Sequence, residues 1–226
     1  MATNEQEFLA HIKKREGTEF NVKNEHISYE DKIKPKGYLT GGYGHLLSKD
    51  EITAYPRGTP IPIEVVDQWL VNDTRKAIAA ARQQGSEMKH TPTESFIYAL
   101  ASVNFQLGTE WRTKNADGSL GGFKGAWAAL KSGNYDSTIA NINFNNPGRM
   151  ENPYMPAFMS ASTGWKIQTK NRVADFELAI RKFKGEVNAI KYVEESAFSL
   201  TQLEKNAKKG YGKLKPMVKE YSQYGK

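Results

Sequence analysis

The sequence predicts an α+β fold that is mainly helical. Apolar residues recur at the spacing of amphipathic helices over most of the chain. Strand-like alternation of Tyr, Ile and Thr with polar residues is confined to about residues 18–45, where glycines and Pro35 mark turns. Hydrophobic residues make up 38% of the 226 positions, which suits one large domain or a smaller domain with additions.

The first elements are predicted from two capping boxes. Thr3 and Gln6 form the first pair, and the apolar stripe that follows predicts a helix over residues 3–15. Ser48 and Glu51 form the second pair, which predicts a short helix after the strand-like segment.

Helices account for most of the remaining chain. A long helix is expected at about 62–84, closed by Gly85. The next helix is expected to start with Thr91 as the cap, Pro92 in the first position and Glu94 completing a capping box. Further predicted boundaries are a helix end at Gly108 and helices at 123–131, 134–142 and 165–184.

The charge and cysteine content narrow the possible functions. A net charge of +7 and a pI near 9.3 favour an anionic partner, such as nucleic acid, a bacterial envelope or an anionic membrane, although charge can serve solubility alone. The chain has no cysteine, which excludes disulfides, thiol catalysis and cysteine-ligated zinc. Its four histidines lack metal-ligand spacing, so we expect no metal and no cofactor. The polar N-terminus is unlike a signal peptide, and no run of 18 apolar residues predicts a membrane span.

An acid at the predicted end of the first helix is the first candidate for catalysis. Glu16 follows that helix directly, where the helix dipole and partial burial are expected to raise the pKa of its carboxyl group. A protonated carboxylic acid and a second, ionised carboxylate together can cleave a glycosidic bond. Thr40 adds a hydroxyl group able to orient a water molecule. Four residues are candidates for the second carboxylate: Glu19, Glu25, Glu30 and Asp31.

Three motifs follow one another along the chain. The first combines Glu16-Gly17, Tyr29-Glu30-Asp31 and the stretch Gly-Tyr-Leu-Thr-Gly-Gly-Tyr-Gly-His-Leu-Leu at 37–47. The others are Phe-Gln-Leu-Gly at 105–108 and Trp-Lys-Ile-Gln-Thr-Lys-Asn-Arg at 165–172. In this order they resemble the phage-type lysozyme (muramidase) family of T-even phages and their relatives, over roughly residues 5–184.

The resemblance implies hydrolysis of the β-1,4 bond between N-acetylmuramic acid and N-acetylglucosamine, with inversion at the anomeric carbon. Glu16 is then expected to be the general acid, Asp31 the second carboxylate and Thr40 the residue that places the water. The residues expected along the saccharide cleft are Leu46, Phe105 and Asn141, with Gln106 beside them.

The resemblance also implies a lysozyme-like fold with two lobes. A small, hairpin-containing lobe is expected at about 17–62, and a larger helical lobe at about 63–185 includes the N-terminal helix. Residues 186–226 are expected to form a basic helical extension, because the sequence from Lys182 onward contains ten Lys and only five Glu. This extension is expected either to hold the enzyme on an anionic envelope, to dock on another protein, or to pack as a solvated appendix.

The spacing of the catalytic residues departs from the family pattern. Fourteen residues separate Glu16 from Asp31 and eight separate Asp31 from Thr40, and both gaps are longer than in the family. Glu30 and Glu25 therefore stay alternatives to Asp31. Neighbouring residues of a strand point to opposite faces, so Glu30 and Asp31 cannot both point into the cleft from an extended strand.

Two further predictions concern the core. His45 follows three glycines and is expected to pair with Asp73 on the long helix, in a structural role. Trp69, Trp127 and Trp165 are expected in the core, whereas Trp111 suits either the core or a sugar-binding surface.

The sequence therefore predicts a monomeric peptidoglycan hydrolase that lyses a bacterial host. It is expected to wait in the host cytoplasm and to reach the wall after the membrane is permeabilised. The alternatives are a muramidase carried in the virion for infection, a non-catalytic wall-binding protein on the same scaffold, and a nucleic-acid binder, for which no motif is present.

Overall fold

A computed structural model describes residues 4–16, 20–21, 23–30, 38–113, 123–142 and 174–195. The chain divides into two compact units, Met1–Arg181 and Lys182–Lys226. The second unit is described only over its first residues, 182–195, which are helical.

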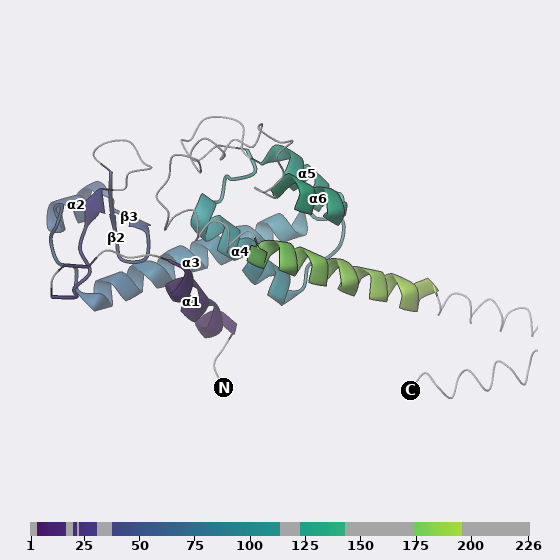
Figure 1. The fold of residues 1–226 in the computed structure, drawn as a ribbon, viewed down its shortest axis with the longest axis horizontal. Coiled ribbons are helices and arrows are strands. Elements are labelled where there is room, and N and C mark those ends of the chain that lie inside the picture. The colour runs from purple at the N-terminus through teal and green to yellow at the C-terminus, as the bar shows by residue number, and fades with distance from the viewer. Residues whose placement is uncertain are drawn as a thin grey trace, which may run out of the picture. The chain divides into compact units, whose positions relative to one another are not determined.

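The first unit is mainly helical and carries one small antiparallel sheet, which confirms the mainly helical α+β class (Figure 1). The sheet has the order β1-β2-β3, with the strands Tyr29–Glu30, Leu39–Gly41 and His45–Leu46. The helices are α1 Asn4–Arg15, α2 Lys49–Ala54, α3 Ile63–Ser86, α4 Glu94–Leu107, α5 Lys124–Lys131 and α6 Tyr135–Ile142. Residues 174–195 are also helical. None of the helices in the described part of the chain is long and apolar enough to cross a membrane.

Several predicted boundaries are confirmed to within two residues, including those of α1, α5 and α6. The capping box before α2 is present, because the Ser48 hydroxyl accepts from the Glu51 N–H at 3.3 Å and the Glu51 carboxylate accepts from the Ser48 N–H at 2.7 Å. Gly108 ends α4 with a φ of 79°, a conformation that favours glycine.

The prediction that Gly85 closes the long helix is wrong. α3 continues to Ser86, and Gly85 is buried within it. A Cβ on Gly85 would lie 2.8 Å from Ile97 Cδ1 and 2.8 Å from Pro92 Cγ. The absence of a side chain at Gly85 therefore allows α3 to pack closely against the start of α4, and the glycine does not terminate the helix.

The predicted start of the next helix is also wrong. α4 begins at Glu94, and Thr93, not Thr91, is the N-cap residue, with no capping hydrogen bond from its side chain. The Glu94 carboxylate accepts two hydrogen bonds from the Arg82 guanidinium of α3, at 2.7 and 3.1 Å. In a capping box, that carboxylate would accept a hydrogen bond from the backbone N–H of the N-cap residue. Here the Glu94 carboxylate binds Arg82 instead.

The last predicted helix, 165–184, extends farther than expected. Its described part is helical from 174 through 195, and 165–173 lie outside the described residues. Within the first unit, two apolar side chains of this helix are buried: Phe176 and Ile180.

α3 is the element that joins the sheet to the other helices. It contacts β3 and α1, and it packs more extensively against α4 (Figure 1). Under the sheet, a core cluster combines hairpin residues with the first turns of α3: Leu39, Leu47, Ile61, Val66 and Trp69. The position of α3 therefore sets where the hairpin lies relative to the end of α4.

The tryptophans of the described part of the chain are core residues. Trp69 and Trp127 are buried, as predicted. Trp111, for which the sequence left two possibilities, is only 2% exposed and belongs to the core as well. Trp165 lies outside the described residues.

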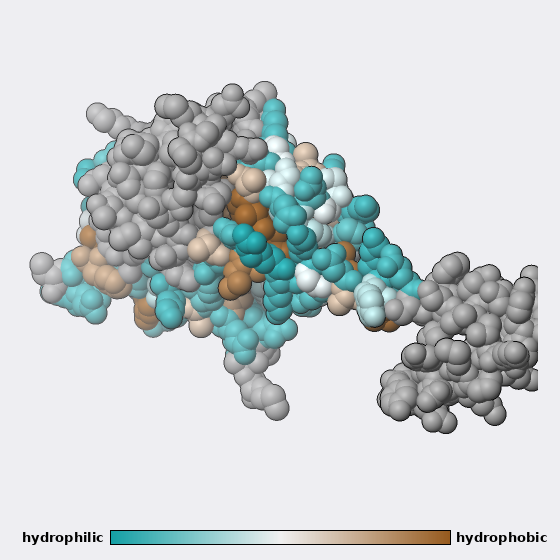
Figure 2. All heavy atoms as spheres, turned by 45° about the vertical axis from the view of Figure 1, so that its right-hand side comes forward, coloured by the Kyte–Doolittle hydropathy of each residue, from teal (hydrophilic) through white to brown (hydrophobic). Residues whose placement is uncertain are grey.

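The described surface is mostly hydrophilic on the face shown in Figure 2, with hydrophobic residues in smaller areas. The described residues of the second unit carry three large apolar side chains that are exposed: Ile190, Tyr192 and Val193. Lysines and glutamates both occur between residues 182 and 195, so this stretch is not a purely basic surface.

Candidate functional site

The hairpin formed by β2 and β3 is shaped by two glycines at its turn. Gly42 and Gly44 have φ values of 55° and 91°, which disfavour residues with a side chain. Gly42 also approaches α3 closely, since a Cβ there would lie 2.7 Å from Val66 Cγ1. The turn is therefore held against the start of α3.

Glu16 lies beside this turn. It is the first residue after α1, and its backbone N–H donates to the Ile12 carbonyl at 2.9 Å. A Cβ placed on Gly44 would lie 3.9 Å from Glu16 Oε2. The side chain of Glu16 is partly exposed. The fold thus brings the predicted acid and the glycine-rich hairpin together, although they are far apart in the sequence.

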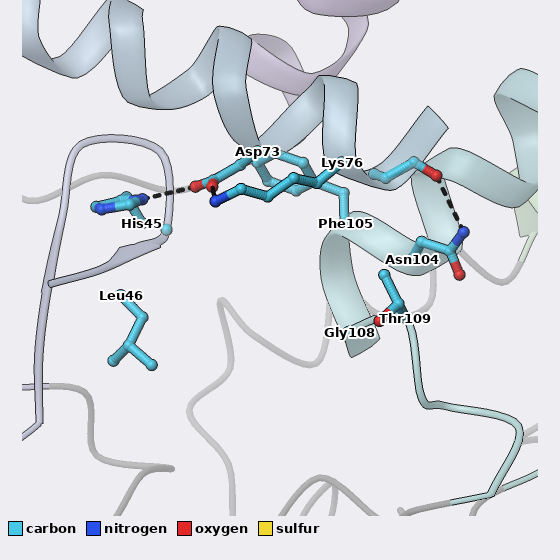
Figure 3. A pocket seen from close by; sticks show the side chains of 10 residues that line it. His45, Leu46, Asp73, Lys76, Asn104, Phe105, Gly108 and Thr109 are labelled. Carbon is cyan, nitrogen blue, oxygen red and sulfur yellow. Dashed lines mark hydrogen bonds and ion pairs between the residues drawn. The ribbon is translucent and has the colours of Figure 1, made fainter. Parts of the chain in front are cut away.

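A pocket of about 320 Å³ opens next to the same turn (Figure 3). One side is formed by the hairpin, one by α3 and one by the end of α4 and the turn after it. Its lining residues are Gly44, His45, Leu46, Asp73, Lys76, Ala77, Asn104, Phe105, Gly108 and Thr109. Two of the predicted cleft residues, Leu46 and Phe105, are among them, and Leu46 is 41% exposed.

Thr40 is a buried residue of the central strand. Its Cα partners are Tyr29 in β1 and Leu46 in β3. The side chain is only 2% exposed, and its Oγ1 has no hydrogen-bond partner among the described residues. Leaving a buried hydroxyl unsatisfied costs about 1–3 kcal/mol, so such groups are uncommon outside functional sites. Thr40 Oγ1 therefore keeps its hydrogen-bonding capacity for another group.

The structure does not bring all the predicted site residues together. Asp31 lies outside the described residues. Gln106, near the end of α4, does not line the pocket, and its buried Oε1 has no hydrogen-bond partner in the part of the chain that the structure describes. Asn141 of α6 is also absent from the pocket lining, and its amide donates to Ser137 Oγ at 3.4 Å.

Two of the alternative carboxylates are paired with other side chains. Glu30 accepts from Arg57 Nη1 at 3.2 Å, and Glu25 accepts from Asn21 Nδ2 at 2.9 Å. Both carboxylates therefore already accept a hydrogen bond from another described side chain. Glu19 lies outside the described residues.

His45 connects the hairpin to two helices. Its Nδ1 lies 2.7 Å from Asp73 Oδ2, which confirms the predicted pair, and its Nε2 lies 3.3 Å from Glu51 Oε2. The ring stacks on Trp69 with 4.5 Å between centroids. Burial acts to lower the pKa of His45, but hydrogen bonds and charges from Asp73 and Glu51 outweigh it, so the pKa lies above 6.5. The cationic ring is thus favoured at the pocket edge.

Some pocket residues were not predicted from the sequence. Lys76 lines the pocket and donates to Asp73 Oδ1 at 3.3 Å, which places a second cation on the carboxylate that His45 uses. Asn104 and Thr109 flank the Phe-Gln-Leu-Gly motif, and Asn104 is a polar residue on the buried face of α4. A polar residue at a buried position of a predicted helix indicates that its side chain needs a hydrogen-bond partner inside the protein.

The described residues contain no group of three or more His, Cys, Asp or Glu side chains that could hold a metal ion. Comparison with known proteins assigns no family, since no protein-family model matches the chain and no curated protein matches it. The functional assignment accordingly depends on the motifs and on the geometry around Glu16.

Proposed function

We propose that the protein is a peptidoglycan hydrolase that cleaves the β-1,4 bond between N-acetylmuramic acid and N-acetylglucosamine. The observation that carries this proposal is the position of Glu16, whose Oε2 lies 3.9 Å from where a Cβ would stand on Gly44. Gly44 lines the pocket, so the Glu16 carboxyl group lies at the edge of an open site. The order of the three sequence motifs supports the same reaction.

In the proposed mechanism Glu16 acts as the general acid. Its carboxyl group gives a proton to the glycosidic oxygen while the bond to the anomeric carbon breaks. Asp31 acts as the second carboxylate and takes a proton from the water that attacks the opposite face of the sugar. An inverting reaction of this kind needs about 6.5–9.5 Å between the two carboxyl groups to leave room for the water.

Thr40 is proposed to hold that water. A hydroxyl can accept one hydrogen bond and donate another, so it can orient a water molecule without removing its proton. The free capacity of the buried Thr40 Oγ1 supports this role. Placing the nucleophile in advance lowers the entropic part of the activation barrier.

The walls of the pocket are suited to a sugar chain. Leu46 and Phe105 provide apolar surface from two different elements, and neighbouring polar groups are available for hydroxyl and amide groups. We propose that Gln106 and Asn141 contact saccharide units farther along the polymer. The reaction needs no metal and no cofactor, because both proton transfers are assigned to side chains.

We propose host cell lysis as the biological role, with the protein acting as a monomer that reaches the wall after membrane permeabilisation. The net charge of +7 supports attraction to anionic envelope polymers rather than any specific contact. A muramidase carried in the virion for infection would use the same chemistry.

The test is product analysis on purified peptidoglycan. The proposal predicts soluble muropeptides with a reducing N-acetylmuramic acid end, because hydrolysis adds one water molecule across the bond. Fragments lighter by one water molecule would instead identify a lytic transglycosylase. Binding to the wall without any released fragment would favour the non-catalytic alternative and overturn the proposal.

A further inference from the structure

Three buried polar side chains form a network behind one wall of the pocket. They are Gln84 of α3, Asn104 of α4 and Trp111 in the turn after α4, with exposed fractions of 1%, 3% and 2%. They come from three separate segments of the chain. Their common position is where α3, the end of α4 and the following turn meet.

Asn104 uses every hydrogen-bonding position of its amide group. Its Oδ1 accepts from Gln84 Nε2 at 2.9 Å and from Trp111 Nε1 at 2.9 Å. Its Nδ2 donates to Gln84 Oε1 at 3.1 Å. The same nitrogen donates to the Ala77 carbonyl at 3.1 Å, which Figure 3 shows as the dashed line from Asn104. An amide side chain has two donor and two acceptor positions, so Asn104 has none left for a ligand.

The network is tied to the pocket at several points. Asn104 and Ala77 line the pocket themselves. Gln84 Nε2 also donates to the carbonyl of Thr109, another lining residue, at 3.3 Å. Phe105 follows Asn104 directly, so the orientation of this turn of α4 determines where the Phe105 ring lies. The wall from 105 to 109 is thus hydrogen-bonded to α3 at both ends, through the Asn104 side chain before it and the Thr109 carbonyl at its end.

Stability alone does not require amides at this place. Replacing both partners of a buried hydrogen bond by apolar groups of the same shape can be nearly neutral for stability. A fully satisfied polar network, in contrast, fixes one arrangement of the elements it joins. The hydrogen bonds of Asn104 therefore specify geometry at the pocket wall.

We propose that Asn104 is a positioning residue for substrate binding. With Gln84 and Trp111 it holds the wall from 105 to 109 at the spacing from the hairpin that a sugar chain requires. Asn104 acts through Phe105 and Thr109 and does not contact the substrate with its own amide. This inference rests on the proposed function, since it assumes a saccharide in the pocket.

Two variants test the inference. Gln84→Met keeps the length of the side chain and removes its hydrogen bonds, and Trp111→Phe removes the indole donor together with part of the buried ring. Tyr135→Phe is the matched control, because it removes the hydroxyl that is bonded to His90 Nδ1 at 2.8 Å, away from the pocket lining. Gln84→Met and Tyr135→Phe are expected to lower the melting temperature by a similar amount, about 2–4 °C, and Trp111→Phe by more, because the smaller ring leaves a cavity.

The deciding readout is the split between KM and kcat on soluble, uncross-linked peptidoglycan strands. We expect Gln84→Met and Trp111→Phe to raise KM about three- to tenfold while kcat stays within about twofold, and Tyr135→Phe to change neither. Unchanged KM in both network variants, with the melting temperature lowered, would overturn the inference.

Failure of the proposed function can be distinguished from failure of this inference. If the wild type releases no fragments from peptidoglycan, the proposed function fails, and NMR chemical shifts then decide the structural claim. Shifts of Phe105 and Thr109 that move in Gln84→Met but not in Tyr135→Phe would support positioning of the wall. Unmoved shifts at both residues would overturn it.

Discussion

His45 Nδ1 lies 2.7 Å from Asp73 Oδ2, so β3 is bonded directly to α3. β3 pairs with β2, the strand that contains Thr40. The other ring nitrogen of His45 reaches Glu51 of α2 at 3.3 Å. One side chain of the hairpin is therefore held between carboxylates from two helices. This arrangement fixes the hairpin on α3, the element that also supports the opposite wall of the pocket.

Replacing Asp73 by Asn should lower stability and largely spare activity. The change removes the charge that stabilises the cationic His45 ring, which we expect to cost about 1–3 kcal/mol of unfolding free energy. Urea denaturation measures this loss. Asp67→Asn on the same helix is the control, because its bond to Lys13 Nζ at 2.6 Å is between exposed side chains and should contribute less than about 1 kcal/mol. An inactive Asp73→Asn variant of wild-type stability would contradict the structural role.

The contribution of this pair should disappear at alkaline pH. The pKa of His45 is raised above 6.5 because Asp73 and Glu51 outweigh the effect of burial. A raised pKa in the folded state gives stability that is fully present below 6.5 and is lost as the pH rises through the folded pKa. The difference in unfolding free energy between wild type and Asp73→Asn should therefore shrink as the pH rises. A difference that stays constant from about pH 6 to about pH 10 would contradict this.

Gly85→Ala should destabilise the protein, although alanine favours helices. If Gly85 lay on an exposed face within the helix, alanine would stabilise by about 0.5–1 kcal/mol. We expect a loss of about 1–3 kcal/mol, because the added Cβ would lie 2.8 Å from Pro92 Cγ and Ile97 Cδ1. The double variant with Ile97→Val should recover part of the loss, since it removes that Cδ1. If the double variant is no more stable than Gly85→Ala, the contact with Ile97 Cδ1 is not the cause of the loss.

Asp31→Asn should abolish activity if Asp31 is the second carboxylate. Loss of a general base typically lowers the rate by about 10²–10⁴-fold. Glu30→Gln is the matched comparison, because Glu30 is adjacent and its carboxylate accepts from Arg57 at 3.2 Å. We expect it to keep activity within about threefold of wild type. Loss of activity in Glu30→Gln but not in Asp31→Asn would transfer the role to Glu30.

The sequence predicted those features that depend on local pattern. The apolar stripe and Gly108 gave the ends of α1 and α4, and the pairing of Ser48 with Glu51 gave the start of α2. The His45–Asp73 pair was predictable because a histidine after a glycine turn needs a partner once the following helix buries it.

Features that depend on contacts between distant elements could not be predicted in this way. Glu94 matched the pattern of a capping box, but Arg82 of the neighbouring helix binds its carboxylate. Glu51 was assigned to its cap, and its second contact, with His45, needs the hairpin to be in place. The amide of Asn104 has partners 20 and 7 residues away, in Gln84 and Trp111, and nothing in the local sequence specifies them.

The most direct test of Glu16 as the general acid is the rate at which Glu16→Gln lowers the turbidity of bacteria with a permeabilised outer membrane. Glu7→Gln is the matched control, because Glu7 lies on an exposed position of α1. We predict that Glu16→Gln folds like the wild type and loses about 10²-fold or more of the rate, while Glu7→Gln keeps it. A folded Glu16→Gln variant as active as Glu7→Gln would contradict the assignment of Glu16 as the general acid.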